Sequence, residues 1–235
     1  MKTNIVLPIA GNGQRFVDKG YKTIKPLIEV NGQYLVEKSM ESVDYTEANL
    51  IFIVRQEHVD EFDIENKLKE RFGQDITVIK VDHITEGALC TCLLAEKYID
   101  NDNPLVIFTP DCYFEPKFHV NQVDSKYDGV VAVFHSTSPA HSYVQLNDDQ
   151  CVTKAAEKEV ISEYAVGGLY YFRYGNLFVK YAHKQIEMNM RTKGEFYICP
   201  VYNLLIEDGL KIGIDRNARH EILGTPEDLE RYLNA

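Results

Sequence analysis

Short apolar runs recur along the first part of the chain and are rich in valine and isoleucine. They lie at residues 4–10, 50–55, 76–81, 105–109 and 129–135. Runs of this length and composition are typical of buried strands. The intervening stretches at 34–43, 57–72 and 88–99 carry apolar residues at helical spacing. Strands that alternate with helices predict an α/β fold, in which helices cover both faces of a mostly parallel sheet.

The pattern changes in the second part of the chain, where strands and helices no longer alternate. Strands are predicted at 143–146, 164–173 and 210–214, and helices at 175–190 and 197–207. The tail, GTPEDLERYL, has the signature of a helix start, because Thr225 is a good N-cap and Pro226 suits the first turn. We therefore expect the chain to end in a helix that packs against the rest of the molecule.

No internal repeat, low-complexity tract or linker rich in proline and serine interrupts the sequence. Its 235 residues suit one domain over 1–235, and the polar stretch 136–142 divides that domain into the halves 1–135 and 136–235. Ligands of open α/β sheets bind beyond the carboxyl ends of the strands. The residues that directly follow each predicted strand are therefore the first candidates for a functional site.

Charge and composition exclude several classes of protein. Lys and Arg total 25 against 36 Asp and Glu, so the net charge is −11, which does not suit a general nucleic-acid binder. No apolar run approaches the roughly 20 residues that span a bilayer, and the first residues reach glycine before a signal-peptide core is complete. We expect a cytoplasmic protein without a membrane partner. Five scattered cysteines favour buried reduced thiols over a metal site.

A glycine-containing loop, AGNGQRF, follows the first predicted strand at residues 10–16. Glycines let the backbone approach a phosphate closely, and Arg15 adds a cation with several donors. Phe16 stands where the dinucleotide fingerprint needs a third glycine, and the Gly-Lys-Ser/Thr of the P-loop is missing. A simple strand-to-helix turn would explain the glycines but not Arg15 and Lys25 in an acidic protein. The loop therefore predicts a phosphate cradle of another type.

A strand that runs into G-x-G-x-R-F and then K-P-L resembles the opening of the sugar-phosphate nucleotidyltransferases, or nucleotide-sugar pyrophosphorylases. The resemblance implies a GT-A-like, Rossmann-like α/β fold, with a mixed, mostly parallel sheet flanked by helices in a single domain. It implies that Gly11 and Gly13 hold nucleotide phosphates, that Arg15 assists the departure of pyrophosphate and that Lys25 contacts phosphate. Ile24 stands where the family commonly has proline.

The segment ITEGALCTCLLA, residues 84–95, is similar to the family's turn and helix beneath the nucleotide base. Gly87 matches the base-contacting glycine. Asp82 and His83 lie near the position where relatives often carry a base-reading glutamine, so the base stays open. The resemblance thus implies nucleotide contacts from Ala10, Gly11, Asn12, Gly13, Asp82, Thr85, Glu86 and Gly87.

Asp111 comes just after the apolar run LVIFT and matches the family's metal-binding aspartate. An aspartate at this position is otherwise a common turn residue. Mg²⁺ binds one or two carboxylates together with phosphate oxygens, so a single aspartate is enough to begin a magnesium site. Ile222 stands where many relatives have a second aspartate. The second ligand is left open among Glu221, Asp215, and Asp111 with water alone.

The second half resembles the family's acceptor-binding half. Its segments VTKAAEKEVISEYAVGGLYYFR and GEFYICPVYNLLIEDG match the family's E-K, G-L-Y and G-E positions. Lysine there faces the acceptor phosphate, and carboxylates suit sugar hydroxyls because they only accept hydrogen bonds. The aromatic side chain of Tyr170 is expected to pack inward. The implied acceptor residues are Glu157, Lys158, Gly168 and Glu195. Ser142 and Tyr143 are expected to touch the acceptor because they lie at the seam between the two halves.

The resemblance implies transfer of a nucleoside monophosphate from a nucleoside triphosphate to a sugar 1-phosphate, with release of pyrophosphate. Arg15, Lys25 and Asp111 would carry the catalysis, with Mg²⁺ on Asp111. The halves 1–135 and 136–235 would bind nucleotide and acceptor, and the product would supply surface or capsular polysaccharide synthesis.

Three alternatives to this reaction remain, and the oligomeric state is open, a homo-oligomer included. The first is a cytidylyltransferase that acts on a phosphorylated non-sugar such as phosphocholine. The second is a nucleotide-binding regulatory subunit without catalysis, suggested by Ile222. The third, a GT-A glycosyltransferase, is disfavoured because Asp111-Cys112-Tyr113 lacks the second aspartate of an Asp-x-Asp motif.

Overall fold

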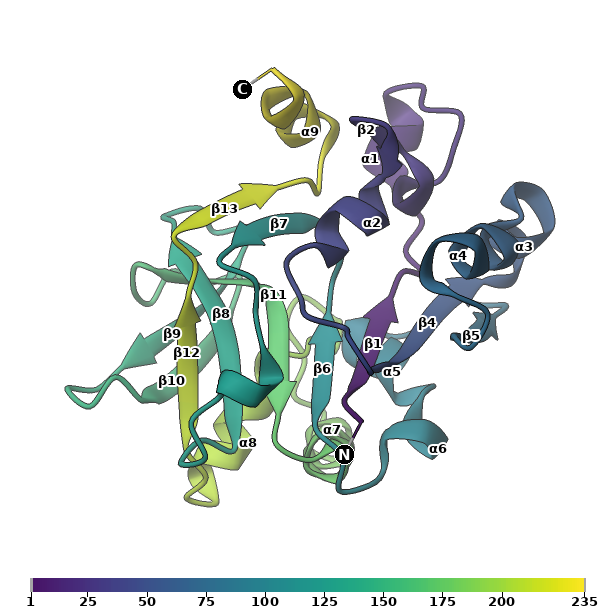
Figure 1. Cartoon of the computed structure of the whole chain (residues 1–235). Coiled ribbons are helices and arrows are strands. Elements are labelled where there is room, and N and C mark those ends of the chain that lie inside the picture. The colour runs from purple at the N-terminus through teal and green to yellow at the C-terminus, as the bar shows by residue number, and fades with distance from the viewer. Residues whose placement is uncertain (1, 235) are drawn as a thin grey trace.

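A computed structural model describes residues 2–234, which contain one nine-stranded sheet at the centre of the molecule (Figure 1). Its strands are β1 (Asn4–Pro8), β4 (Asn49–Arg55), β5 (Thr77–Val81), β6 (Leu105–Phe108), β8 (Gly129–His135), β9 (Ser142–Leu146), β10 (Val152–Glu157), β11 (Tyr164–Phe172) and β12 (Ile212–Arg216). The main order is β10-β9-β11-β6-β1-β4-β5, and β8 joins β11 to β12. Both halves of the chain therefore share this sheet.

The sheet is mixed. The strands β6, β1, β4 and β5 run parallel to one another, and so do β8 and β12. The long strand β11 runs antiparallel to β6, β8 and β9. The predicted fold class, a mixed sheet flanked by helices, is confirmed. At its parallel end the fold brings the carboxyl ends of β1, β4 and β6 to one edge of the sheet.

Helices cover both faces of the sheet. They are α1 (Gln14–Asp18), α2 (Leu35–Met40), α3 (Gln56–Phe62), α4 (Ile64–Phe72), α5 (Ala88–Leu93), α6 (Glu96–Ile99), α7 (Gly175–Glu187), α8 (Val201–Glu207) and α9 (Pro226–Leu233). Residues of α5, α7 and α8 pack on one face, and residues of α2 and α4 on the other. Alternate residues of β1 enter the two cores, Val6 the first and Ile5 and Leu7 the second. Strands buried on both faces need apolar residues at every position, as these runs have.

Two predicted helices are each broken in two. The stretch 57–72 divides at Asp63, which has φ 53° and accepts a hydrogen bond from the Asn66 side chain at 2.8 Å. Aspartate tolerates this left-handed conformation better than most residues. The stretch 88–99 divides after α5, where Leu94 and Ala95 separate it from α6. The periodicity is continuous across both breaks, so it did not reveal them.

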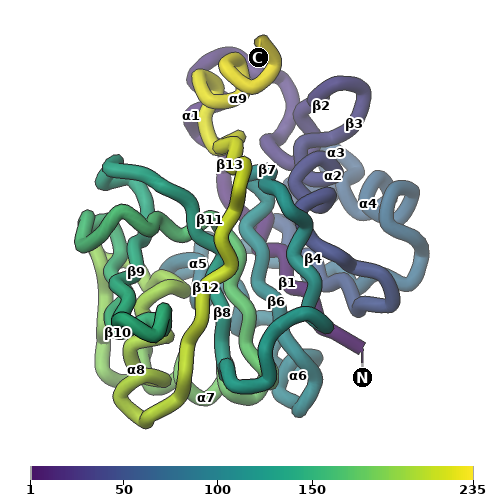
Figure 2. The backbone as a smooth tube through the Cα atoms, turned by 60° about the vertical axis from the view of Figure 1, so that its left-hand side comes forward, coloured from purple at the N-terminus to yellow at the C-terminus, as the bar shows by residue number. Residues whose placement is uncertain are grey.

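Short elements complete the fold beside the sheet. They are the 3₁₀ turns η1 (Lys25–Leu27) and η2 (Val120–Gln122), the hairpin of β2 (Glu29–Val30) and β3 (Gln33–Tyr34), and the antiparallel pair β7 (Cys112–Glu115) and β13 (Arg219–Ile222). Figure 2 shows β13 and β7 side by side above the main sheet, with α9 beyond them. The pair ties the end of the chain to the strand that directly follows Asp111.

The predicted final helix, α9, forms a small third core with the segment after the glycine loop. Leu229 of α9 is buried in one cluster with Phe16 of α1 and with Leu223. Glu227 also pairs with Lys19 at 2.9 Å. As predicted, Thr225 caps the helix by accepting a hydrogen bond from the Asp228 backbone at 3.1 Å. The C-terminal helix therefore supports α1, which carries Arg15.

An imidazole lies between two phenylalanine rings beside this third core. The His220 ring stacks on Phe134 with 4.0 Å between ring centroids and faces Phe114 at 5.9 Å. One ring nitrogen lies 3.1 Å from the Asn217 side-chain oxygen. Burial between the rings lowers the pKa of His220 to about 4.

We expect this histidine to make the protein less stable in mild acid. The unfolded chain binds a proton near pH 6.5, whereas folded His220 resists protonation down to about pH 4. Its contribution is therefore complete above pH 6.5 and is lost as the pH falls toward 4, by about 3 kcal/mol at most. Urea unfolding at pH 7 and pH 5 should show a smaller pH dependence for His220→Phe than for the wild type. The control is His135→Gln at an exposed site, which should keep the pH dependence of the wild-type stability. If His220→Phe keeps the same pH dependence as this control, the assignment is contradicted.

No helix within residues 2–234 is both long enough and apolar enough to cross a membrane.

Candidate active site

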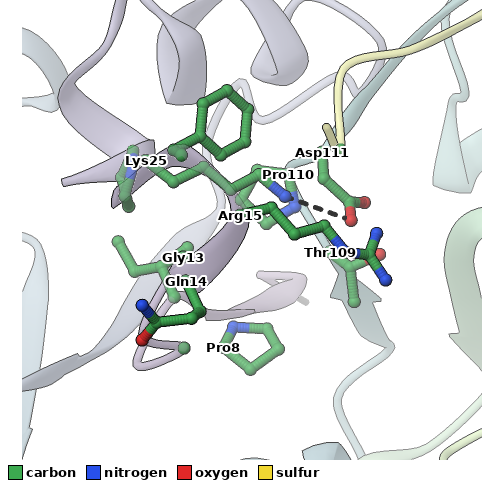
Figure 3. Close-up of a pocket in the computed structure, with 13 residues that line it drawn as sticks. Pro8, Gly13, Gln14, Arg15, Lys25, Thr109, Pro110 and Asp111 are labelled. Atoms are coloured by element: carbon green, nitrogen blue, oxygen red, sulfur yellow. Dashed lines mark hydrogen bonds and ion pairs between the residues drawn. The ribbon is translucent and has the colours of Figure 1, made fainter. Parts of the chain in front are cut away.

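The glycine loop and Asp111 meet because they follow two neighbouring parallel strands. The loop follows β1, and Thr109, Pro110 and Asp111 follow β6, which pairs with β1. Together they line a cavity of about 370 Å³ (Figure 3). Its lining includes Gly11, Gly13, Arg15, Lys25, Thr109 and Asp111. The structure thus brings together the three residues for which catalytic roles were predicted.

The glycine loop is held at both of its sides. Gly13 has φ 59°, and a Cβ there would lie 3.3 Å from the Lys25 Cβ, so glycine lets the loop pass close to Lys25. On the other side, the Arg55 guanidinium at the end of β4 donates to the Asn12 side chain and pairs with Glu57 at 2.9 Å. Arg55 belongs to none of the sequence motifs that predict the site. The sequence feature that could have identified Arg55 is a cation at the end of a predicted strand.

Lys25 and Asp111 form an ion pair across the cavity. The Lys25 ammonium lies 3.3 Å from a carboxylate oxygen of Asp111, as the dashed line in Figure 3 shows. The side chains are 20% and 45% exposed, so the carboxylate remains open to a ligand. Lys25 begins the turn η1, whose Pro26 and Leu27 are buried. This buried turn fixes the lysine at the cavity wall.

Among the described residues, Asp111 is the one carboxylate that lines this cavity. Glu221 is bonded to Arg219 at 2.9 Å, and Asp215 lines a different hollow with Phe118 and Tyr127. Across residues 2–234 there is no group of three His, Cys, Asp or Glu side chains that could hold a metal ion. One carboxylate fits Mg²⁺, which keeps several waters and takes further ligands from substrate phosphates. Neither Glu221 nor Asp215 lines this cavity.

A second hollow of about 290 Å³ adjoins the first, and Pro8, Gly11 and Thr109 line both. Its other lining residues include Ala10, Asn12, Thr85, Gly87 and Glu195. Most of the residues predicted to bind the nucleotide therefore surround two connected spaces. Glu195, which was predicted on the acceptor side, lies at the boundary with them.

Two of the residues predicted to bind the nucleotide point elsewhere. The Asp82 side chain is 87% exposed and lines neither hollow. It pairs at 2.8 Å with His83, which does line the second hollow. This neighbour lowers the pKa of Asp82 through a hydrogen bond. The Glu86 side chain pairs with Arg191 on the facing turn. Neither carboxylate lines either hollow, whereas Thr85 of the same segment lines the second.

The predicted acceptor residues form a group beside the second hollow. Ser142 donates a hydrogen bond to Glu157, and burial raises the pKa of that carboxyl, with repulsion from Glu195 adding to the shift. Lys158 has φ 56°, and its ammonium lies 5.2 Å from the centre of the Tyr197 ring. Two carboxyl groups and one ammonium are thus gathered next to the second hollow.

Gly168 allows β11 to approach the strand end that carries Asp111. It has φ 77°, and a Cβ would lie 2.7 Å from the Thr109 hydroxyl oxygen. Thr109 donates its backbone N–H to the Gly168 carbonyl at 2.9 Å. The structure therefore gives Gly168 a packing role close to the cavity.

The structure corrects the prediction for Tyr143. Its side chain is fully buried, and its hydroxyl donates to the Ser138 carbonyl at 2.7 Å, so no surface is left for an acceptor. Ser142 and Tyr143 are adjacent on β9, and adjacent strand residues point to opposite faces. Tyr170 is buried and packs near Tyr202, as its predicted packing role requires.

Comparison with known proteins assigns this chain to a family. Residues 4–210 match the model of the family described as nucleotidyl transferase, so the chain belongs to the nucleotidyl transferase family and is a nucleotidyltransferase. The resemblance predicted from the sequence is thereby confirmed. No curated protein matches the chain in sequence.

Solved structures of similar fold cover almost the whole chain. The nucleoside-diphosphate-sugar pyrophosphorylase of Vibrio cholerae RC9 is 25% identical, with a TM-score of 0.85 over 98% of this chain and 100% of that chain. The inositol-1-phosphate CTP transferase of T. maritima is 16% identical, with a TM-score of 0.76 over 100% and 94%. A UDP-glucose pyrophosphorylase bound to UDP-glucose is 16% identical, with a TM-score of 0.74 over 100% and 98%. The last two show a shared fold.

Proposed function

We propose that this nucleotidyltransferase joins a nucleoside monophosphate to a sugar 1-phosphate and releases pyrophosphate. The observation that carries the proposal is the meeting of Arg15, Lys25 and Asp111 at one cavity beside the glycine loop. Similarity over 98% of the chain to a nucleoside-diphosphate-sugar pyrophosphorylase supports the sugar acceptor. Glu157 and Glu195 also support it, because carboxylates accept hydrogen bonds from hydroxyl groups.

The chemistry requires position and charge more than proton transfer. A phosphate oxygen of the acceptor attacks the α-phosphorus of the triphosphate, and the bond from that phosphorus to the bridging oxygen breaks. The phosphate monoester is already an anion near neutral pH, so no general base is needed. Arg15 and Lys25 would neutralise the charge that develops on the departing pyrophosphate. The cavity walls would hold the reacting groups in line.

Enzymes of this family generally use a divalent metal ion. In this chain Asp111 would hold Mg²⁺, together with phosphate oxygens of the substrates. When bound, the ion supplies positive charge that neutralises the phosphates. Lys25 lies beside the same carboxylate and would keep it oriented toward the cavity.

The two halves of the chain would bind different substrates. Residues 1–135 would bind the nucleotide, through the glycine loop and Thr85, and residues 136–235 the acceptor, with Lys158 on its phosphate. We place the reaction in the cytoplasm, where the five cysteines, all free in the described chain, would stay reduced. Its product would serve the synthesis of surface polysaccharide.

A pyrophosphate-release assay tests the proposal. CTP, UTP, GTP, dTTP and ATP are each combined with Mg²⁺ and with sugar 1-phosphates or phosphocholine. We expect release that requires one triphosphate and one sugar 1-phosphate together. Release only with phosphocholine would overturn the sugar acceptor. Tight binding of a triphosphate without release from any pair would favour a regulatory subunit and overturn the enzymatic proposal.

A further inference from the structure

Two exposed segments from different halves of the chain are joined beside the second hollow. They are the nucleotide-side loop, residues 82–87, and the acceptor-side turn, residues 192–195. The Phe196 backbone N–H donates to the Glu86 carbonyl at 2.8 Å, and the Leu89 N–H donates to the Phe196 carbonyl at 3.1 Å. A Cβ at Gly87 would lie 2.3 Å from the Phe196 carbonyl oxygen. Only glycine lets the two backbones approach this closely.

One side chain, Arg191, contacts both segments. Its guanidinium pairs with the Glu86 carboxylate of the loop and donates to the Gly194 carbonyl of the turn at 2.9 Å. The same guanidinium lies 4.0 Å from the centre of the Phe196 ring. Arginine is suited to this position because its planar fork makes several directed bonds while stacking on a ring.

These contacts act on local order more than on the stability of the whole fold. The ion-paired side chains of Arg191 and Glu86 are 30% and 67% exposed, and exposed pairs of this kind contribute little to global stability. The first part of the loop is little buried, as the 72% exposure of Ile84 shows, whereas Thr85 is hydrogen-bonded to Thr91 of α5 at 2.6 Å. Segments with little burial open easily unless something else holds them. Here the contacts with the facing segment add to the bonds that the loop makes with α5.

The joined segments carry groups that line the second hollow. Thr85 and Gly87 belong to the loop, and Glu195 is the last residue of the turn. The turn is a tight reversal in which Thr192 and Glu195 exchange two backbone hydrogen bonds of 3.0 Å. The Glu195 carboxylate therefore lies on a segment that is joined to the loop and lines the same hollow.

We infer that Arg191 is a positioning residue that couples the nucleotide-side loop to the acceptor-side turn, so that nucleotide binding places Glu195 for the acceptor. The inference rests on the proposed function for the identity of the two ligands. If the first ligand orders both segments, the second binds to a turn that is already ordered and gains affinity. Such coupling typically amounts to about 5- to 150-fold in affinity.

Hydrogen–deuterium exchange of the whole protein without ligands tests whether Arg191 holds the loop and the turn together. We expect Arg191→Met to speed exchange at the Leu89 and Phe196 amides together, by about fivefold, the lower end of typical coupling. The matched control is Arg216→Met. Arg216 also stacks on a ring, that of Tyr164 at 4.8 Å, and bonds one side chain, but it lies away from the site. Unchanged exchange in Arg191→Met, or equal effects in both variants, would overturn the inference.

A second arm adds CTP, UTP, GTP, dTTP or ATP in turn, without acceptor. In the wild type, the triphosphate that binds should slow exchange in both segments. In Arg191→Met it should slow exchange in residues 82–87 but not in 192–195, and equal slowing of the turn would overturn the inference. If no triphosphate protects either segment of the wild type, the proposed function fails, and the exchange of the free protein still decides the role of Arg191.

Discussion

Replacing Lys25 with methionine is expected to lower kcat by about 10²- to 10³-fold, the usual loss when one preorganised charge-stabilising group is removed. The Lys25 ammonium lies at the cavity 3.3 Å from Asp111, where the triphosphate would place its negative charge. Because this is a partly exposed pair, its loss should change the free energy of unfolding by no more than about 1 kcal/mol. Steady-state kinetics and thermal unfolding of the same preparation separate the two effects.

Lys22→Met is the matched control for this substitution. Lys22 is exposed and precedes Lys25 in the same segment, but it lines a different hollow, beside His58. Its replacement should leave kcat within about twofold, since surface substitutions away from the site have small effects. Equal kcat in Lys25→Met and Lys22→Met would contradict the role given to Lys25.

The second large effect is expected for Asp111→Asn, with kcat lowered by about 100-fold and more Mg²⁺ needed for half-maximal rate. The amide has nearly the shape of the carboxylate but no charge, and oxygen ligands of Mg²⁺ are chiefly carboxylates and phosphates. The loss of kcat should be larger than in a site with two carboxylate ligands, because the described residues give this cavity no second carboxylate that could still bind the ion. Titration of the rate with Mg²⁺ measures both effects.

The two other carboxylates considered from the sequence provide the controls. Glu221→Gln and Asp215→Asn should leave the Mg²⁺ titration unchanged, because neither side chain lines the cavity. A shifted titration in either variant would show that the second ligand lies there. Normal turnover with unchanged Mg²⁺ dependence in Asp111→Asn would remove the assignment of Asp111.

The centre of the candidate site could be predicted because its residues follow buried strands in order. Apolar runs located β1 and β6, and parallel neighbours necessarily bring the loop after β1 close to Asp111. The character of the loop, with Arg15 and Lys25 in an acidic protein, pointed to phosphate. The character of the loop and the place of Asp111 after a buried strand are readable without the structure, and the resemblance to the nucleotidyltransferases implied their roles. The pairing of β1 with β6 comes from the structure.

Long-range pairings could not be predicted in the same way. The strand β13 pairs with β7 about a hundred residues earlier, and nothing in HEIL identifies its partner. Arg191 and Glu86 meet only because two loops of different halves face each other. The prediction that both Ser142 and Tyr143 touch the acceptor conflicts with strand alternation, which allows only one of two adjacent side chains to face the site.

The most direct test of the account follows the α-phosphorus itself. The enzyme is incubated with Mg²⁺, a sugar 1-phosphate and a nucleoside triphosphate labelled at the α-phosphorus, and the labelled products are separated. The account predicts that the label moves into a product that contains both the nucleoside monophosphate and the sugar phosphate, while pyrophosphate is released without label. Label that stays in the triphosphate for every acceptor, or that appears only in free nucleoside monophosphate, would contradict it.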